Sequence, residues 1–436
     1  MKKILFFYNK LSSTFWFIPV VIIIIALILA VTLVVLDQEV SISQNGFGKY
    51  FFVNSADSGR SILSTISGAM IGVAGTVFSV TLVALTLASS QFGPRLIKNF
   101  MHVKLNQVVL GSYVATYLYC LFILNAVKEN DNYTFIPVIS ILVAIVAALI
   151  NIVLLILFIH QIAMSIQADQ IISDVSGIIY KQSDNLYPSQ MGNDLASEKI
   201  KIVEAIKSKY LHTIQLKSPK NGYFQYIDSE SLIELISSYD ALLELHNRPG
   251  DYLVKNLEIG ILYCNEKPTE KQLNKIYNQF VFGRDKSYNQ DIEFSIHQMV
   301  EIASRALSPG VNDPFTAITC IDNLTAIVCL FTEINFPSSY RVDQQERLRV
   351  IANTTSFEGI LDASFNQIRQ FSAGNPSVII RLMEGLITIN KLAHRDNQIK
   401  AIRKHAKMVL NSGKESIKEE LDFLDLEERS KKILAN

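Results

Sequence analysis

The first part of this sequence lacks charge of either sign over long stretches. The chain has 436 residues, and its 40 Lys and Arg balance 40 Asp and Glu, but most of these residues lie after Asp169. The balanced charge provides no basic excess for nucleic acid and no acidic tail for a basic partner, so we expect no nucleic-acid partner. An uncharged apolar part followed by a charged part predicts a membrane region joined to a soluble region.

Cysteine is scarce, and recognisable catalytic motifs are absent from the sequence. The four cysteines, Cys120, Cys264, Cys320 and Cys329, form no CxxC pair and have no histidine at metal-binding spacing, so we expect buried free thiols and no metal. The sequence contains no P-loop, nucleophile elbow, HExxH or dinucleotide fingerprint. We therefore expect no cofactor, and an enzyme is the least favoured class of function.

Four uncharged tracts are long enough to cross a bilayer, which requires about 20 apolar residues per helix. We expect these spans at residues 15–36, 62–90, 108–127 and 134–160, within a transmembrane domain of residues 1–165. The first tract has no clear cleavage site after it, which favours a retained anchor over a signal peptide. The second tract extends from Ser61 to Pro94, so it should tilt, kink or project from the bilayer.

The distribution of basic residues predicts the topology. Lys2, Lys3 and Lys10 precede the first span, and further basic residues lie between the second and third spans, whereas the other loops carry fewer. Because basic loops stay on the cytoplasmic side, both termini and the soluble region should be cytoplasmic.

One side of the second tract carries a stripe of small and hydroxyl side chains at helical spacing. The stripe consists of Ser64, Gly68, Gly72, Gly75, Ser79, Thr86 and Ser90. It has two interpretations: a packing seam, because Gly68 and Gly72 form a GxxxG pair, or a path lined by hydroxyls and backbone. The expected spans contain no Asp, Glu, Lys or Arg, which favours a passive conduit over a proton-driven pump.

The segment SSQFGPR ends the second tract. Gly93 and Pro94 should break the helix there. We expect Gln91, Pro94 and Arg95 to form the inner mouth of any path. Arg95 is either an interfacial anchor, which is the commoner role, or a gate that attracts anions.

The soluble region predicts three segments. Residues 166–209 should continue the fourth helix beyond the membrane and then form a linker. Residues 210–266, with short β-like runs and the turns SPKNG and RPGD, predict a small β-barrel-like module. Residues 267–436 read as amphipathic helices. The expected fold class is a mainly α membrane protein with four transmembrane helices, followed by an α+β region with this β-barrel-like module and a helical C-terminal domain.

The stretch SRALSPGVNDPFTAI predicts a tight corner between two helices. Pro309 should end the first helix and Gly310 can take positive φ, while Asp313 caps the second helix and Pro314 occupies its first position. We expect the helix pair to pack through Phe315, Ile318 and Ile321. The functional alternative is that Arg305 and Asp313 form a charge pair or contact a partner or ligand.

Three blocks resemble the predicted bacterial membrane proteins grouped as domain of unknown function 2254. These blocks are Gly75–Phe100, RPGDYL at Arg248–Leu253, and Ala303–Leu324. The resemblance implies a multi-span protein of the bacterial inner membrane with a cytoplasmic C-terminal domain, and it implies no activity. The cytoplasmic motif then consists of Arg284, Asp285, Asp291, Arg305, Ser308, Pro309, Asn312, Asp313 and Pro314.

Two functions remain open from the sequence. The first is an oligomeric channel or passive transporter for an ion or small solute, with a cytoplasmic domain that assembles or gates it. The alternative is a non-transport scaffold or sensor that binds a cytoplasmic partner or ligand. In the first, copies of the chain associate in the lipid bilayer as a homo-oligomer.

Overall fold

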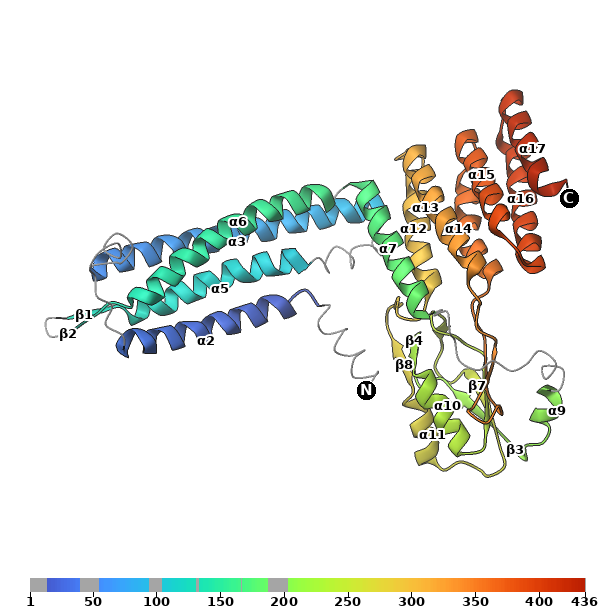
Figure 1. Ribbon diagram of the computed structural model, residues 1–436, viewed down its shortest axis with the longest axis horizontal. Helices are drawn as coiled ribbons and strands as arrows, with labels where there is room; N and C mark the ends of the chain where they lie inside the picture. Colours follow the sequence, from blue (N-terminus) through green and yellow to red (C-terminus); the bar gives the residue numbers. More distant parts are fainter. Residues whose placement is uncertain are drawn as a thin grey trace. The chain divides into compact units, whose positions relative to one another are not determined.

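The computed structural model describes residues 14–39, 55–93, 104–130, 133–165, 167–186 and 203–435. Contacts divide the chain into two compact units, Met1–Gln170 and Ile171–Asn436. The described residues of the first unit are mainly helical and include one short hairpin, and those of the second combine sheets with helices (Figure 1).

The first unit contains four long apolar helices. They are α2 (Phe17–Glu39), α3 (Ala56–Phe92), α5 (Lys104–Ala126) and α6 (Val138–Ser165), with the hairpin β1 (Lys128–Asn130) and β2 (Tyr133–Phe135) between α5 and α6. Helix α5 packs against the other three. In the 18-residue apolar stretch of α5, 50% is buried, compared with 6% in that of α2. The interior of the bundle is therefore built around α5.

Polar contacts tie these apolar helices together at fixed points. Tyr113 on α5 donates to the carbonyl of Asn151 on α6 at 2.7 Å, and the Asn151 amide donates to Thr116 at 2.8 Å. Asp37, near the end of α2, accepts from the backbone N–H groups of Ile139 and Ser140 at 2.9 and 3.0 Å, which caps the start of α6. Such bonds fix the register of helices whose surfaces are otherwise alike.

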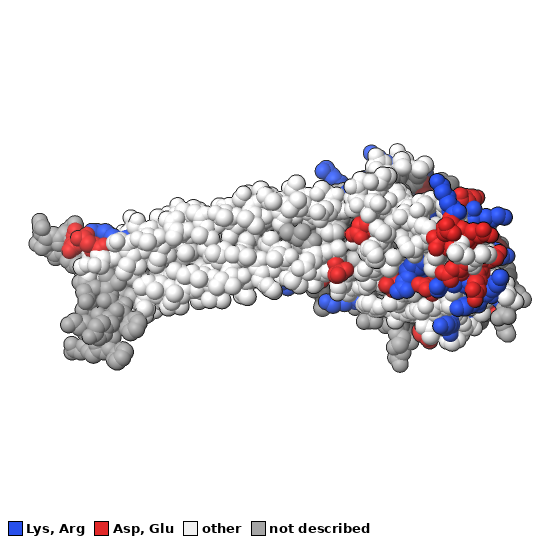
Figure 2. All heavy atoms as spheres, turned by 90° about the horizontal axis from the view of Figure 1, so that it is seen from above, with Lys and Arg blue, Asp and Glu red and all other residues white. Residues whose placement is uncertain are grey.

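In the described part of the first unit, charged side chains lie at or near the helix ends and in the hairpin. Asp57 and Glu129 lie 3.5 and 3.8 Å from Arg60 at the end that carries the β1–β2 hairpin. Between the ends, the face of the unit seen in Figure 2 carries no Lys, Arg, Asp or Glu. Among the described residues, five helices are long and apolar enough to cross a membrane: these four and α13 (Pro314–Glu333).

Helix α13 differs from the other apolar helices because it belongs to the core of the second unit. Its buried side chains include Ile321, Leu324 and Phe331, each 0% exposed. It packs against α12 (Ile292–Ala306), α14 (Phe357–Phe371) and α15 (Pro376–Leu392). Its Asp322 forms a paired contact with Arg381 of α15 at 2.6 and 2.8 Å. The hydropathy of α13 is thus accounted for by burial within the unit.

The strands of the second unit form two open sheets. One has the order β3-β7-β5-β10-β9 and the other β6-β4-β8. The strands are β3 (His212–Lys217), β4 (Gly222–Ile227), β5 (Leu242–Leu245), β6 (Tyr252–Leu253), β7 (Glu258–Cys264), β8 (Phe280–Gly283), β9 (Tyr340–Val342) and β10 (Leu348–Ala352). The short helices α9 (Val203–Lys207), α10 (Ser229–Ser238) and α11 (Glu270–Tyr277) accompany them.

The expected β-barrel-like module is wrong in one respect: the strands do not close into a barrel. The larger sheet instead takes β9 and β10 from beyond residue 266, and β10 pairs parallel to β5. Arg349 of β10, 1% exposed, is held there by Asp343 and Asp240, each at 2.8 Å. The local sequence patterns predict neither the pairing of β10 with β5 nor the open edges of the two sheets.

The helices after residue 291 form three hairpins, α12–α13, α14–α15 and α16–α17, where α16 is Asp396–Ser416 and α17 is Glu420–Leu434. Arg248 contacts both the first turn of α12 and Thr355, just before α14, so these two helices start at the same end. Helix α16 runs beside α14 in the same direction, because Lys404 meets Glu358 and Ser412 meets Arg369. The loops that close the hairpins therefore all lie at the opposite end (Figure 1).

Helix α7 (Ala168–Leu186) is separate from α6, which ends at Ser165. Residues 168–186 are thus helical, as expected of the extension, but they form a second helix and not a continuation of α6. Ser176 of α7 donates to Asn323 of α13 at 3.0 Å, which holds α7 on the first hairpin. Burial of Ile172, Val175 and Ile179 at 1% exposure or less explains the amphipathic pattern that made the helix seem continuous.

Candidate functional site

Every residue of the predicted α3 stripe is exposed on the surface of the single chain. Ser64, Gly68, Gly72, Gly75, Ser79, Thr86 and Ser90 all lie outside the bundle. The buried side of α3 is a different set, which includes Leu63, Met70, Ala74, Val77 and Ala84. At about 100° per residue, the two sets lie on nearly opposite sides of the helix. Within one chain the stripe is thus not a packing seam.

The glycines and hydroxyls of this face have distinct surroundings. A Cβ atom added to Gly68, Gly72 or Gly75 would meet nothing within 4 Å. The hydroxyls of Thr76 and Thr86 donate to carbonyls one turn earlier, at 3.2 and 2.9 Å. Because each hydroxyl has a single proton, the oxygen of each threonine presents only acceptor lone pairs to the outside.

The predicted inner mouth is described only in part. Gln91 is exposed in the last turn of α3, and Gly93 follows as the C-cap with φ of 115°. This positive φ matches the expected break after the helix. Pro94 and Arg95 lie outside the described residues.

The polar positions of the cytoplasmic motif are separated by the length of α12. Asp291 caps the first turn of this helix, whereas Arg305 lies in its last turn and the corner follows. For a helix of 15 residues the two ends are about 22 Å apart. Arg284 and Asp285 are exposed before the helix. The motif therefore forms two sites rather than one.

The corner at the far end of α12 is built largely as its residues predict. Asp313 caps α13 by accepting from Thr316 N at 3.1 Å and from its hydroxyl at 2.6 Å, and Pro314 follows at the first helical position. The hydroxyl bond lowers the pKa of Asp313, so this carboxylate is charged and engaged. The ion pair found for Arg305 is with Glu301 at 3.7 Å.

Two expectations for the corner are wrong. The positive φ of the turn lies at Asn312, at 49°, and not at Gly310, because Asn tolerates the left-handed region through its short polar side chain. Phe315 is 79% exposed and does not join Ile321 in the helix pair. As the second residue of α13, it lies beyond the end of the contact with α12.

At the near end of α12, the RPGD turn meets the helix. One guanidinium nitrogen of Arg248 donates to both carboxylate oxygens of Glu293, at 2.7 and 2.8 Å, and the other donates to Thr355 at 2.6 Å. Asp251 accepts from the backbone N–H of Arg248 at 3.0 Å and so shapes the turn. A charged cluster thus joins the sheet to the first turn of α12 and to the segment before α14.

Asp291 lies in the centre of this cluster. It is 7% exposed, accepts from Phe294 N at 3.0 Å, and has Lys286 at 3.7 Å. Burial raises the pKa of Asp291 above its usual value, with Lys286 opposing that shift. Gly250, with φ of 103°, packs directly against the Asp291 carboxylate, so a side chain there would be strained and would also collide with it.

Most of this cluster is not predicted by the sequence. Arg248 and Asp251 lie in the RPGDYL block, for which the sequence predicts no role, and no predicted site includes Lys286, Glu293 or Thr355. Asp291 followed by Glu293 at a helix start is a recognisable capping signal. No local signal connects Arg248 with Thr355, which lies 107 residues later in the chain.

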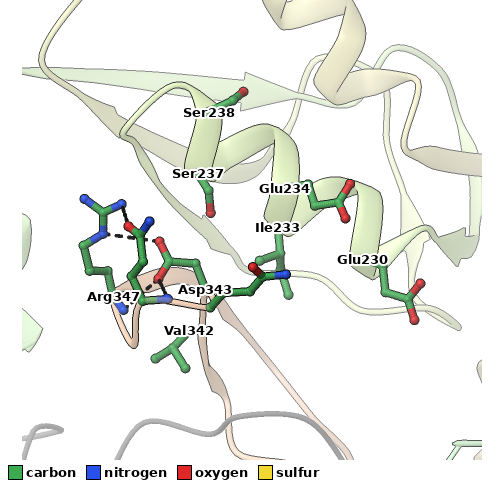
Figure 3. A pocket seen from close by; sticks show the side chains of 10 residues that line it. Glu230, Ile233, Glu234, Ser237, Ser238, Val342, Asp343 and Arg347 are labelled. Carbon is green, nitrogen blue, oxygen red and sulfur yellow. Dashed lines mark hydrogen bonds and ion pairs between the residues drawn. The ribbon is translucent and has the colours of Figure 1, made fainter.

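A pocket of about 570 Å³ lies between α10 and the β9–β10 turn. Figure 3 shows Arg347 folded onto Asp343 at one end, with Glu230 and Glu234 toward the other. Arg347 also donates to Gln345. Arg347 lies 3.4 Å from Asp343, so its charge is compensated. Within the described part of the chain, no group of three or more His, Cys, Asp or Glu is placed to hold a metal ion.

Comparisons with known proteins agree with the resemblance drawn from the sequence. A family model described as a predicted membrane protein, DUF2254, matches residues 12–388. Uncharacterised proteins of Mycobacterium bovis and Mycobacterium tuberculosis are 30% identical over 383 residues, which cover 86% of this chain and 72% of theirs. No solved structure matches the chain.

Replacing Gly250 tests the close approach of the turn to Asp291. We expect Gly250→Ala to destabilise the protein by about 1–3 kcal/mol, because positive φ and the contact with Asp291 both penalise a Cβ atom. Thermal unfolding in detergent, followed with a thiol-reactive dye that reports exposure of buried Cys264 and Cys320, measures the change. Gly310→Ala is the control, since open space surrounds Gly310. Equal midpoints for the two variants would contradict this account.

Asp291→Asn tests the buried charge. The amide still caps α12, but it does not ionise. Because the pKa of Asp291 is raised in the folded protein, the wild type loses stability as pH rises from the unfolded-state pKa through the folded-state pKa. We therefore expect the variant to gain stability relative to wild type between acidic and neutral pH. The same dye assay at several pH values measures this, and a difference that is independent of pH would disprove it.

Proposed function

The chain belongs to the DUF2254 family of predicted membrane proteins, and we propose that it is an oligomeric channel or passive transporter whose second unit assembles or gates it. The observation that carries this proposal is the outward-facing stripe of glycine and hydroxyl residues on α3. Large apolar side chains contact lipid more favourably than small or hydroxylated side chains do. A face of glycine and hydroxyl residues along α3 therefore favours contact with another copy or with water.

The packing of the first unit supports a path between copies over a path through one chain. The centre of the bundle is occupied by α5, whose Tyr113 and Tyr119 are 1% and 3% exposed. Several α3 helices arranged around an axis would instead place Gly72, Gly75 and their neighbours along a shared path. Helix α3 has 37 residues, about 55 Å, so it would extend beyond a hydrocarbon core of about 30 Å.

The hydroxyl geometry indicates the class of solute. Since the protons of Thr76 and Thr86 are used within the helix, the oxygens facing outward can accept but not donate. A wall of acceptors favours cations or neutral donors over anions. We therefore propose a small cation or polar solute as cargo.

We propose that α2, α3, α5 and α6 are the spans, in the bacterial inner membrane with both termini in the cytoplasm. The basic residues near the amino terminus and after α3 support this orientation. The packing of α13 within the second unit and the pairing of its Asp322 with Arg381 argue against α13 as a fifth span.

Flux into liposomes tests the proposal. We expect purified protein to carry K⁺ above the rate of empty vesicles, and Thr76→Val together with Thr86→Val to reduce this flux while assembly is unchanged, because only oxygen atoms are removed. Gly72→Leu should reduce both flux and assembly by inserting bulk into the stripe. Phe78→Trp is the control for added bulk, because Phe78 is 46% exposed and lies about 120° around α3 from Gly72.

The outcomes separate the two interpretations of the stripe. No flux above empty vesicles, for K⁺ and for small neutral solutes alike, would overturn the channel. A Gly72→Leu protein that dissociates, combined with threonine variants that conduct like wild type, would assign the stripe to packing between copies.

The alternative function, a sensor for a cytoplasmic ligand, is favoured by one observation: the pocket between α10 and the β9–β10 turn. Its carboxylates, Glu230, Glu234 and Asp343, outnumber the single arginine in its lining, Arg347. This balance suits a small organic cation. We expect spermidine to raise the unfolding temperature of wild type and to lose that effect in a Glu230→Gln, Glu234→Gln protein. Equal shifts for both proteins, or none for wild type, would argue against a cation site.

A further inference from the structure

The corner between α12 and α13 presents apolar side chains to solvent. Phe315 is 79% exposed, more than any other large apolar side chain that the structure describes, including those of the apolar helices in the first unit. Val311, in the turn itself, is 56% exposed. Pro309 and Gly310 are exposed beside them. A buried helix pair has no packing reason to carry Phe at this position.

The corner holds these side chains in a fixed arrangement. The backbone N–H of Asn312 donates to Ser308 at 2.9 Å, and that of Asp313 donates to Ala306 at 2.8 Å. Asp313 is the only charged residue from Ser308 to Ile318. Its carboxylate accepts from the backbone N–H and the hydroxyl of Thr316, so the single charge beside the apolar tip is held in the cap of α13.

Contacts of α7 within the second unit show that the α12–α13 corner lies at the same end of this unit as the start of α7. Ser176 of α7 lies at Asn323 of α13, and Gln182, farther along α7, donates to Tyr288, which precedes α12 at the end away from the corner. Helix α7 therefore runs parallel to α13. Its contact lies about 12 Å from its start and about 14 Å from the start of α13. The first turn of α7 is thus level with the corner.

The covalent chain limits how far this end can be from a membrane. Only Ile166 and Gln167 separate α7 from Ser165, the last residue of α6. Helix α6 is long and apolar enough to cross a bilayer. The end of the second unit that carries Phe315 is therefore the end nearest, along the chain, to a span.

Charge increases away from this tether. The tip between α14 and α15, residues 372–375, carries no charged residue, whereas the tip between α16 and α17 contains Lys418 and Glu419 and is followed by Glu420 and Asp422. Figure 2 shows Lys, Arg, Asp and Glu gathered toward the part of the second unit where α16 and α17 lie. The apolar corner lies at the start of α7, which follows α6 in the chain, and the charged tip between α16 and α17 lies farther away. This arrangement suits a unit that contacts lipid at one edge.

We propose that Val311 and Phe315 insert into the interface of the bilayer that the chain's own spans cross, so that the α12–α13 corner is a lipid contact of the second unit. Aromatic side chains are favoured at the headgroup level. An inserted apolar tip would lie about 5–10 Å into the headgroup and acyl boundary. This contact is independent of transport, and it holds for a channel and for a sensor alike.

Tryptophan fluorescence tests the contact in the full chain. The sequence has one tryptophan, Trp16, so a Trp16→Phe, Phe315→Trp protein carries a single reporter at the corner. We expect its emission to be blue-shifted in phosphatidylcholine–phosphatidylglycerol vesicles, and quenched when the acyl chains are brominated near the carbonyl. Leu211→Trp in the same background is the matched control, because Leu211 is 77% exposed beside the sheet. It should be quenched by aqueous acrylamide and not by bromine.

Each outcome decides the proposal. Quenching by bromine at position 315 but not at 211 supports it, and Val311→Trp, which should behave alike, guards against a local effect of one substitution. Emission at 315 that responds only to acrylamide would overturn it. Emission that is shielded from acrylamide, unaffected by bromine and exposed again in nanodiscs with one copy would assign the corner to a contact between copies, and this too would overturn the proposal.

Discussion

The contact of Arg248 with Glu293 joins the two kinds of structure in the second unit. Through it the RPGD turn, which is fixed to β4, meets the first turn of α12, and Thr355 adds the segment before α14. Charge-assisted bonds in a partly buried setting are stronger than neutral ones and more specific in geometry. The cluster holds the start of α12 and the segment before α14 at the same place. Because the helical hairpins begin with these helices, the cluster sets the direction in which the hairpins run from the sheet.

Helix α12 therefore has two differently built ends. At its start, burial raises the pKa of the capping residue Asp291, whose carboxylate lies close to Gly250 and Lys286. At the corner beyond its end, Asp313 is stabilised by Thr316 and caps the next helix. The same residue type at the same kind of position thus has opposite pKa shifts, because one is desolvated and the other is hydrogen-bonded near solvent. The start of α12 joins the helices to the sheet, and the corner after its end presents an apolar tip.

In the first unit the decisive fact is the side of α3 on which each set of residues lies. Larger apolar residues such as Leu63 and Met70 face α5 and α6, whereas the glycines and most hydroxyls face away. A single chain therefore leaves its smallest and most polar helix face uncovered. Both proposed roles of this face, assembly and conduction, require more than one copy, so one stripe can serve both.

The sequence by itself determined the apolar helices, the family and the caps of the corner, because span length, absence of charge and capping chemistry are local properties. Hydropathy alone also marks α13 as long and apolar enough to cross a membrane, since it does not distinguish lipid from a protein core. Only the tertiary structure decided that Phe315 is exposed, that the α3 stripe faces outward, and that β10 joins β5 in an open sheet. These features depend on which surfaces meet across long separations in the chain, and that information is absent from any local pattern.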